Sequence, residues 1–184
     1  FIGSNKYNSL KFINKIYFHK NKIFNDTELS YDKTFYPLGL LTDTRNISKK
    51  RRIVQVQFSI PLANESKLEP LIMKLINKQI PILCSIKKLA QQENFNNLSF
   101  YQEGWTVAVD FAYHEFNQEE AEKFYEELSK YGGKIYLAKD SSLDEKNFRL
   151  MYPEYDGWKK IVKSVDPKNL YQSMLSKRLG LKEW

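Results

Sequence analysis

Residues 105–137, WTVAVDFAYHEFNQEEAEKFYEELSKYGGKIYL, predict a strand, a helix and a second strand in one continuous stretch. Large apolar side chains alternate with Thr106, Ala108 and Asp110, and a period of two predicts a strand over 105–112 with one apolar face. The helix that follows begins near Asn117, and its apolar stripe consists of Ala121, Phe124, Tyr125 and Leu128. Gly132-Gly133 predicts the end of this helix, and a short strand is expected over Lys134–Leu137.

The preceding 50 residues repeat this order. A strand is predicted over Arg52–Ile60, with Val54, Val56, Phe58 and Ile60 on one face and Gln55, Gln57 and Ser59 on the other. Ser66-x-x-Glu69 predicts a capping box for a helix whose apolar stripe is Leu68, Leu71, Ile72, Leu75 and Ile76. A further strand is expected over Ile82–Leu89, and residues 90–102 are an Asn/Gln-rich loop.

The element order is therefore βαββαβ, which predicts an α+β, ferredoxin-like antiparallel sheet with its helices on one face, followed by a helical C-terminal segment. Alternation places one set of side chains on the open face: Gln55, Gln57, Cys84, Ile86, Lys88, Thr106, Ala108 and Tyr136. This set is compatible with a site floor lined by donors and acceptors. It is also compatible with a face that is simply solvated.

The two ends of the chain differ from this central part. Residues 7–19 have helical spacing, and residues 20–50 predict a long irregular arm that ends in the basic run Lys49–Arg52. Pro153 and Pro167 interrupt the helical pattern after residue 140. We expect two parts, residues 1–133 and the closing segment 134–184.

Composition excludes some functions and leaves others open. A chain of 184 residues with 42% hydrophobic residues can bury a core, and no apolar run approaches membrane-spanning length. The single cysteine, Cys84, excludes an internal disulfide and is better explained by packing than by nucleophilic chemistry. His19 and His114 lack metal-ligand spacing, and there is no phosphate-binding glycine motif. The net charge of +7 is compatible with nucleic acid, an anionic membrane or a phosphorylated ligand.

Several motifs of the closing segment occur in a fixed order: Ala138-Lys-Asp-Ser, Phe148-x-x-Met-Tyr-Pro, Trp158, Val165-Asp-Pro and a basic, Leu-rich end. This segment resembles the C-terminal end of FAD-linked oxidases of the vanillyl-alcohol-oxidase type, and is most similar to the decaprenylphosphoryl-β-D-ribose oxidase branch. In that family the βαββαβ unit is the substrate-binding cap. The resemblance covers most of the chain and is strongest over residues 104–181.

The resemblance implies roles for individual residues. Gln55 and Gln57 match a strand that lines the substrate site, and Lys88 matches a site lysine with Cys84 and Ile86 as apolar neighbours. Thr106 and Ala108 replace an asparagine and a cysteine of the family pattern. Tyr136 and Lys139 match a tyrosine and a lysine beside the flavin, and Lys139 is the expected catalytic residue.

The resemblance also implies the chemistry. We expect the C-terminal part of an FAD-dependent enzyme that oxidises a hydroxyl of a sugar or of a polyprenyl-phosphoryl pentose, from 2′-OH to ketone, by hydride transfer to flavin. The FAD-binding domain of the family is not found in these residues, so this chain alone is expected to bind no FAD. A lipid-linked sugar substrate, a partner reductase, a cytoplasmic location and peripheral membrane association are further expectations, with no nucleic-acid partner and no metal.

Three alternatives remain open at this point. A βαββαβ fold with net positive charge is also typical of RNA-recognition modules, although Glu103 and Val107 stand where a basic and a stacking aromatic residue are wanted. A purely structural interaction domain is also compatible with this sequence. Among the oxidases, a sugar-1,4-lactone oxidase is the alternative to the pentose enzyme.

Overall fold

The fold was determined from a computed structural model, which describes residues 52–91 and 97–182, together with 12, 15, 16, 18, 19, 30 and 31. The chain divides into two compact units, residues 1–47 and 48–184. Phe12, Lys15, Ile16, Phe18 and His19 are helical, in agreement with the helix predicted over residues 7–19. The rest of that helix, and nearly all of the predicted arm 20–50, lie outside the described residues.

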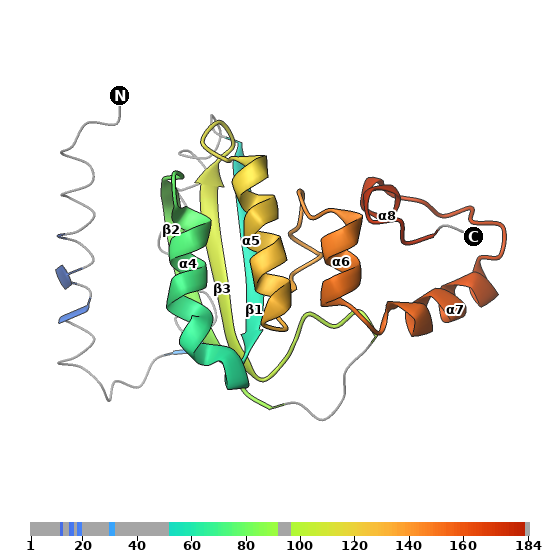
Figure 1. Cartoon of the computed structure of the whole chain (residues 1–184), viewed down its shortest axis with the longest axis horizontal. Coiled ribbons are helices and arrows are strands. Elements are labelled where there is room, and N and C mark those ends of the chain that lie inside the picture. The colour runs from blue at the N-terminus through green and yellow to red at the C-terminus, as the bar shows by residue number, and fades with distance from the viewer. Residues whose placement is uncertain are drawn as a thin grey trace. The chain divides into compact units, whose positions relative to one another are not determined.

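The second unit is built on a four-stranded antiparallel sheet. Its strands are β1 (Ile53–Pro61), β2 (Pro81–Leu89), β3 (Gly104–Ala112) and β4 (Lys134–Ile135), in the order β2-β3-β1-β4. Helices α4 (Leu68–Ile76) and α5 (Gln118–Lys130) lie on one side of this sheet (Figure 1). The predicted α+β, ferredoxin-like βαββαβ fold is confirmed, with β4 shorter than expected.

The core lies between the sheet and these helices. The predicted apolar faces of the two central strands are buried, as is the stripe of α5: Val54, Val56, Phe58, Ile60, Val107, Val109, Phe111, Ala121, Phe124, Tyr125 and Leu128. On α4, Leu71 and Leu75 are buried, and Leu68, Ile72 and Ile76 pack against the same core. Burial of this apolar surface is the main driving force for the fold.

The helix ends agree with prediction in one case and differ in the other. Asn117 caps α5 by accepting a hydrogen bond from the Glu120 N–H, and Gly132, with a φ of +67°, ends it in the left-handed conformation. The predicted capping box at Ser66 is wrong. A 3₁₀ helix, Leu62–Lys67, runs directly into α4, so Ser66 lies inside a helical turn and cannot occupy the extended cap position.

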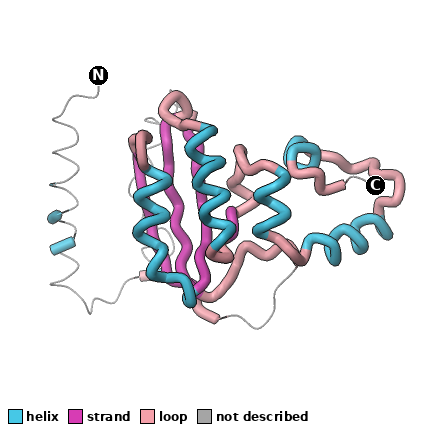
Figure 2. The backbone as a smooth tube through the Cα atoms, in the orientation of Figure 1, coloured by secondary structure: helices cyan, strands magenta, loops and turns pink. Residues whose placement is uncertain are grey.

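The closing segment contains α6 (Glu145–Met151), α7 (Tyr155–Val165) and α8 (Met174–Arg178). Figure 2 shows these helices following the sheet at its β4 side, joined by loops. Its buried side chains belong to the same core as the sheet: Leu143, Phe148, Met151, Tyr152, Tyr155, Leu179 and Leu181. The Tyr152 hydroxyl donates to the Ile135 carbonyl at 2.6 Å, which fixes α6 to β4. The predicted division after residue 133 rests on the expectation that residues 134–184 pack on a separate FAD-binding domain. It stays a prediction.

Candidate functional site

The strand register decides which side chains share the open face of the sheet. Residues directly opposite each other in an antiparallel pair lie on the same face. Gln57 lies opposite Ala108, Gln55 opposite Asp110, and Ser59 opposite Thr106. The predicted grouping of the two glutamines with Thr106 and Ala108 is therefore confirmed.

The prediction for the edge strand β2 is wrong. Cys84 lies opposite Val109, Ile86 opposite Val107 and Lys88 opposite Trp105, so these three residues share the face that the helices cover. The open-face residues of β2 are Leu83, Ser85 and Lys87, which lie opposite Asp110, Ala108 and Thr106. A register irregularity between Pro81 and Leu83 precedes this part of the strand.

Gln57 and Thr106 form the polar centre of the open face. The Gln57 Nε2 donates to the Thr106 Oγ1 at 3.2 Å, and the Thr106 hydroxyl donates to the Phe58 carbonyl at 3.0 Å. The Gln57 Oε1 is buried and has no hydrogen-bond partner among the described residues. Buried acceptors are normally satisfied, so this atom is suited to accept a hydrogen bond from a ligand. Gln55 instead donates from its Nε2 to the Asp110 carboxylate.

The loop before β3 closes one end of this face. The Ser59 hydroxyl donates to the Phe100 carbonyl at 3.0 Å and accepts from the Gln102 Nε2 at 3.0 Å. The Phe100 ring packs against the Tyr136 ring, with 4.8 Å between ring centroids. Sequence patterns gave no role to Phe100 or Gln102, because an irregular loop has no periodicity to interpret.

Tyr136 and Lys139 follow β4 directly. The Tyr136 N–H donates to the Gln57 carbonyl at 2.8 Å, which places the backbone of Tyr136 beside the polar centre. The Lys139 N–H donates to the Tyr136 carbonyl at 3.0 Å and closes a turn over residues 137–139. The Lys139 side chain is exposed at this turn.

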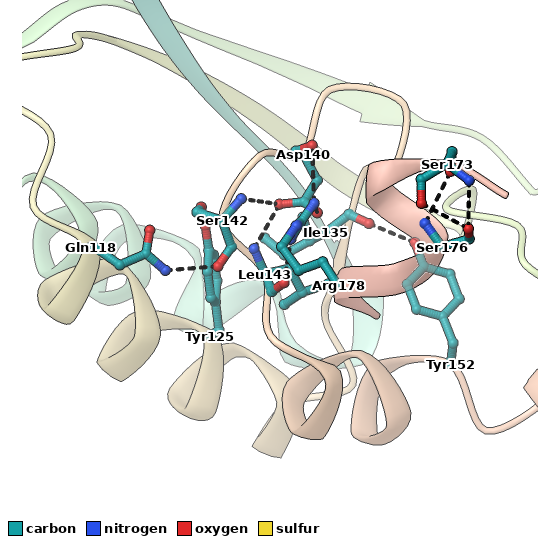
Figure 3. A network of polar contacts seen from close by, with 10 residues as sticks. All are labelled: Gln118, Tyr125, Ile135, Asp140, Ser142, Leu143, Tyr152, Ser173, Ser176 and Arg178. Carbon is teal, nitrogen blue, oxygen red and sulfur yellow. Dashed lines mark hydrogen bonds and ion pairs between the residues drawn. The ribbon is translucent and has the colours of Figure 1, made fainter. Parts of the chain in front are cut away.

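A buried network holds the chain immediately after Lys139 (Figure 3). The Asp140 Oδ1 accepts from the N–H groups of Ser142 and Leu143, at 2.9 and 2.8 Å. The Asp140 Oδ2 accepts from the Arg178 Nη2 at 2.8 Å, and Arg178 also donates to the Leu143 carbonyl. The side chain of Asp140 is only 1% exposed.

The network continues to α5. The hydroxyls of Ser142 and Tyr125 lie 2.5 Å apart, and the Gln118 Nε2 donates to the Ser142 carbonyl at 2.8 Å. Burial raises the pKa of the Tyr125 hydroxyl well above its ordinary value, so Tyr125 is a neutral hydrogen-bonding group and not a base. The segment after Lys139 is thereby fixed to both α5 and α8.

Tyr136 offers an aromatic ring that packs against Phe100, and Lys139 offers an exposed cation three residues later. An aromatic ring and a cation are groups that could contact a flavin ring system. The described residues contain no group of three or more His, Cys, Asp or Glu side chains that could hold a metal ion.

Cys84 is a free thiol on β2. Partial burial raises its pKa, and the nearby Asp110 carboxylate raises it further. The thiolate is therefore disfavoured, which argues against a nucleophilic role. Cys84 is exposed on the edge strand, so the expected packing role is not borne out.

Comparisons with known proteins identify relatives of this chain. The family model described as D-arabinono-1,4-lactone oxidase matches residues 52–179. The decaprenylphosphoryl-β-D-ribose oxidase of Mycolicibacterium smegmatis is 28% identical over 173 residues, which cover 92% of this chain and 37% of that protein. A Streptomyces coelicolor protein, described as an uncharacterized protein in the mprA 5′ region, is 31% identical over 85 residues, 46% of this chain and 23% of that protein. The chain thus spans little more than a third of the length of the Mycolicibacterium smegmatis protein, and less than a quarter of the length of the Streptomyces coelicolor protein.

Proposed function

Because this chain belongs to the D-arabinono-1,4-lactone oxidase family, we propose that it forms the substrate-binding cap and closing segment of an FAD-dependent oxidoreductase. The proposed reaction is oxidation of a sugar hydroxyl to a ketone. The leading substrate class is a polyprenyl-phosphoryl pentose, oxidised at its 2′-OH, because the similarity to decaprenylphosphoryl-β-D-ribose oxidase extends over nearly the whole chain.

The observation that carries the proposal is the buried Gln57 Oε1, which has no hydrogen-bond partner among the described residues, on the amide that donates to Thr106. The Gln57 backbone carbonyl accepts from the Tyr136 N–H, where the segment that leads to Lys139 begins. A sugar hydroxyl that donates to this oxygen would satisfy it and be fixed in one orientation. Gln55, Thr106 and Ala108 complete the floor of the proposed site. The Gln55 amide and the Thr106 hydroxyl offer polar contacts, and Ala108 contributes a methyl group.

Lys139 is the proposed catalytic residue, with Tyr136 as its flavin-side neighbour. When bound, FAD supplies the two-electron acceptor for the oxidation. The Lys139 ammonium stabilises negative charge that develops on the reacting groups.

The edge strand is proposed to meet the lipid-phosphate part of the substrate. The register places Lys88 and Ile86 on the helix side of the sheet, so the lysine of β2 that shares the open face with Gln57 and Thr106 is Lys87. Their strand is exposed along almost its whole length, so both faces of β2 are accessible at the sheet edge. A lysine there can pair with a phosphate diester.

The closing segment is proposed to dock on the FAD-binding part of the full-length protein. Its outer surface carries large apolar side chains that this chain leaves uncovered: Ile161, Val165, Leu170, Tyr171 and Met174. Val165 is 76% exposed and Met174 is 83% exposed. Exposed large apolar side chains of this kind favour an interface, and the matched relative is long enough to supply its other side.

A sugar-1,4-lactone oxidase is the second candidate, since the matching family carries that description. A nucleic-acid module is not favoured. The central open-face positions that would stack on bases carry Gln55, Gln57, Thr106 and Ala108 and no aromatic ring. No helix among the described residues is long and apolar enough to cross a bilayer.

The test is the visible absorbance spectrum of the full-length gene product, with the 184-residue chain measured beside it. We expect a flavin spectrum in the full-length protein only, and bleaching of that spectrum by a polyprenyl-phosphoryl pentose under anaerobic conditions. Bleaching by a sugar lactone alone would support the second candidate. Absence of flavin from the full-length protein after FAD reconstitution would overturn both.

A further inference from the structure

We propose that Arg178 and Asp140 act together as a positioning pair for Lys139; this inference rests on the proposed function of Lys139. Asp140 follows Lys139 directly in the sequence, whereas Arg178 reaches it from α8, 38 residues further on. The pair therefore links α8, the last helix of the closing segment, to the backbone next to Lys139.

The geometry favours a positioning role over a simple surface ion pair. The Asp140 carboxylate is almost fully buried and receives three hydrogen bonds, from two backbone N–H groups and one guanidinium. Each of these donors restricts a different motion of the turn. Such a satisfied network fixes one backbone conformation more firmly than an exposed ion pair does.

The planar guanidinium of Arg178 is suited to holding the 140–143 turn. Its Nη2 donates to Asp140 and its Nη1 donates to the Leu143 carbonyl, so one planar group connects both ends of the 140–143 turn. Lysine carries the same charge but cannot present two donors in this fixed arrangement. Arg178→Lys is therefore expected to keep the charge and lose the constraint.

The backbone of Lys139 is held separately on its N-terminal side and on its C-terminal side. On its N-terminal side, Lys139 is held by the hydrogen bond from its N–H to Tyr136. On its C-terminal side, the described contacts that order the backbone are those of Asp140. Loosening them lets the Lys139 ammonium move relative to the substrate, and a displacement of about 1 Å costs about 100-fold in rate.

Arg149 provides a matched control. Its Nη2 also joins two parts of the closing segment, donating to Glu145 and to the Gly180 carbonyl, both at 3.0 Å. Among the described residues, Arg149 makes no hydrogen bond to the 140–143 turn. Arg149→Lys therefore loses a comparable constraint on the C-terminal end without acting on Lys139.

The experiment uses the full-length holoenzyme and its Arg178→Lys, Asp140→Asn, Arg149→Lys and Lys139→Ala variants. Anaerobic rapid mixing gives the rate constant of flavin reduction and the substrate Kd separately. Hydrogen exchange of peptides spanning residues 138–144 reports the order of the turn independently of activity. Thermal unfolding of each variant measures its stability.

We expect Arg178→Lys and Asp140→Asn to speed exchange over residues 138–144 and to lower the reduction rate constant by tenfold or more. Their substrate Kd should change by less than about threefold, and Arg149→Lys should resemble wild type in rate. Equal rates for Arg178→Lys and Arg149→Lys would overturn the inference, as would exchange that is unchanged over 138–144. Normal flavin reduction by Lys139→Ala would instead overturn the proposed role of Lys139.

Discussion

Val107 and Ile86 lie directly opposite each other on β3 and β2, on the side of the sheet that faces the helices, yet their environments differ completely. Val107 is fully buried, at 0% exposure, whereas Ile86 is 51% exposed. The difference follows from strand order, since β3 is internal and β2 is an edge strand.

Val107→Asp should therefore unfold the domain, and Ile86→Asp should not. A carboxylate at position 107 would be buried without a partner, which costs several kcal/mol and exceeds much of a domain's stability of about 5–15 kcal/mol. At position 86 the carboxylate stays hydrated, and the loss should be about 1 kcal/mol or less. Thermal melts followed by circular dichroism distinguish the two variants. Equal destabilisation would contradict the observed strand order.

This pair also shows what the sequence can and cannot predict. The faces of β1 and β3 were predictable, because large apolar side chains occupy every second position from Val54 to Ile60 and from Trp105 to Phe111. The face of β2 was not, because Ile82, Leu83, Cys84 and Ile86 place apolar side chains at both parities. An edge strand that is exposed on both faces has no burial pattern to preserve.

The candidate site divides in the same way. Gln57 and Thr106 could be grouped from alternation alone, and Lys139 from its motif. The Arg178–Asp140 contact could not be predicted, because it joins residues 38 positions apart through side chains in irregular segments. Phe100 and Gln102 were missed for the same physical reason.

Gln57→Ala should weaken substrate binding more than it lowers stability. In the folded chain Gln57 makes one side-chain hydrogen bond, to Thr106, and Thr106 keeps its bond to Phe58 without it. We expect a loss of about 0.5–1.5 kcal/mol in unfolding free energy, but at least a tenfold rise in substrate Kd. Substrate titration of the flavin spectrum and urea unfolding measure the two effects.

Gln79→Ala is the matched control for this glutamine. Gln79 is buried, and its amide donates to the Leu75 carbonyl and accepts from the Asn117 N–H. Its loss removes a partner from the buried Leu75 carbonyl and from the Asn117 N–H at the start of α5, so stability should fall by about 1–3 kcal/mol with substrate Kd unchanged in the folded fraction. If Gln57→Ala behaved like Gln79→Ala, Gln57 would be a structural residue.

Asp166 should make the closing segment sensitive to acid. Its carboxylate accepts hydrogen bonds from Lys182 and from the N–H groups of Leu170 and Tyr171, and these, with Lys182 first, lower its pKa. A pKa that is lower in the folded state stabilises the fold above the unfolded-state pKa of about 3.9. This contribution is lost as pH falls through the folded-state pKa.

Asp166→Asn should accordingly be less stable than wild type at pH 7, and the difference should close as the pH falls below about 4. Urea midpoints at a series of pH values test this, with Asp156→Asn, an exposed position of α7, as the control. A difference that stayed constant from pH 7 to pH 2.5 would show that the charge of Asp166 is not responsible.

Lys139→Ala should strongly slow flavin reduction by substrate in the full-length enzyme without unfolding it. The side chain is exposed in this chain, so its removal leaves no cavity and stability should change by about 0.5 kcal/mol or less. Loss of a cation that stabilises developing charge is expected to lower the reduction rate constant by about 10²–10³. Lys130→Ala is the control, since it removes another exposed lysine from the end of α5, on the helix side of the sheet. Anaerobic rapid-mixing spectra measure both variants, and a Lys139→Ala enzyme that is reduced as fast as Lys130→Ala would place the catalytic cation elsewhere.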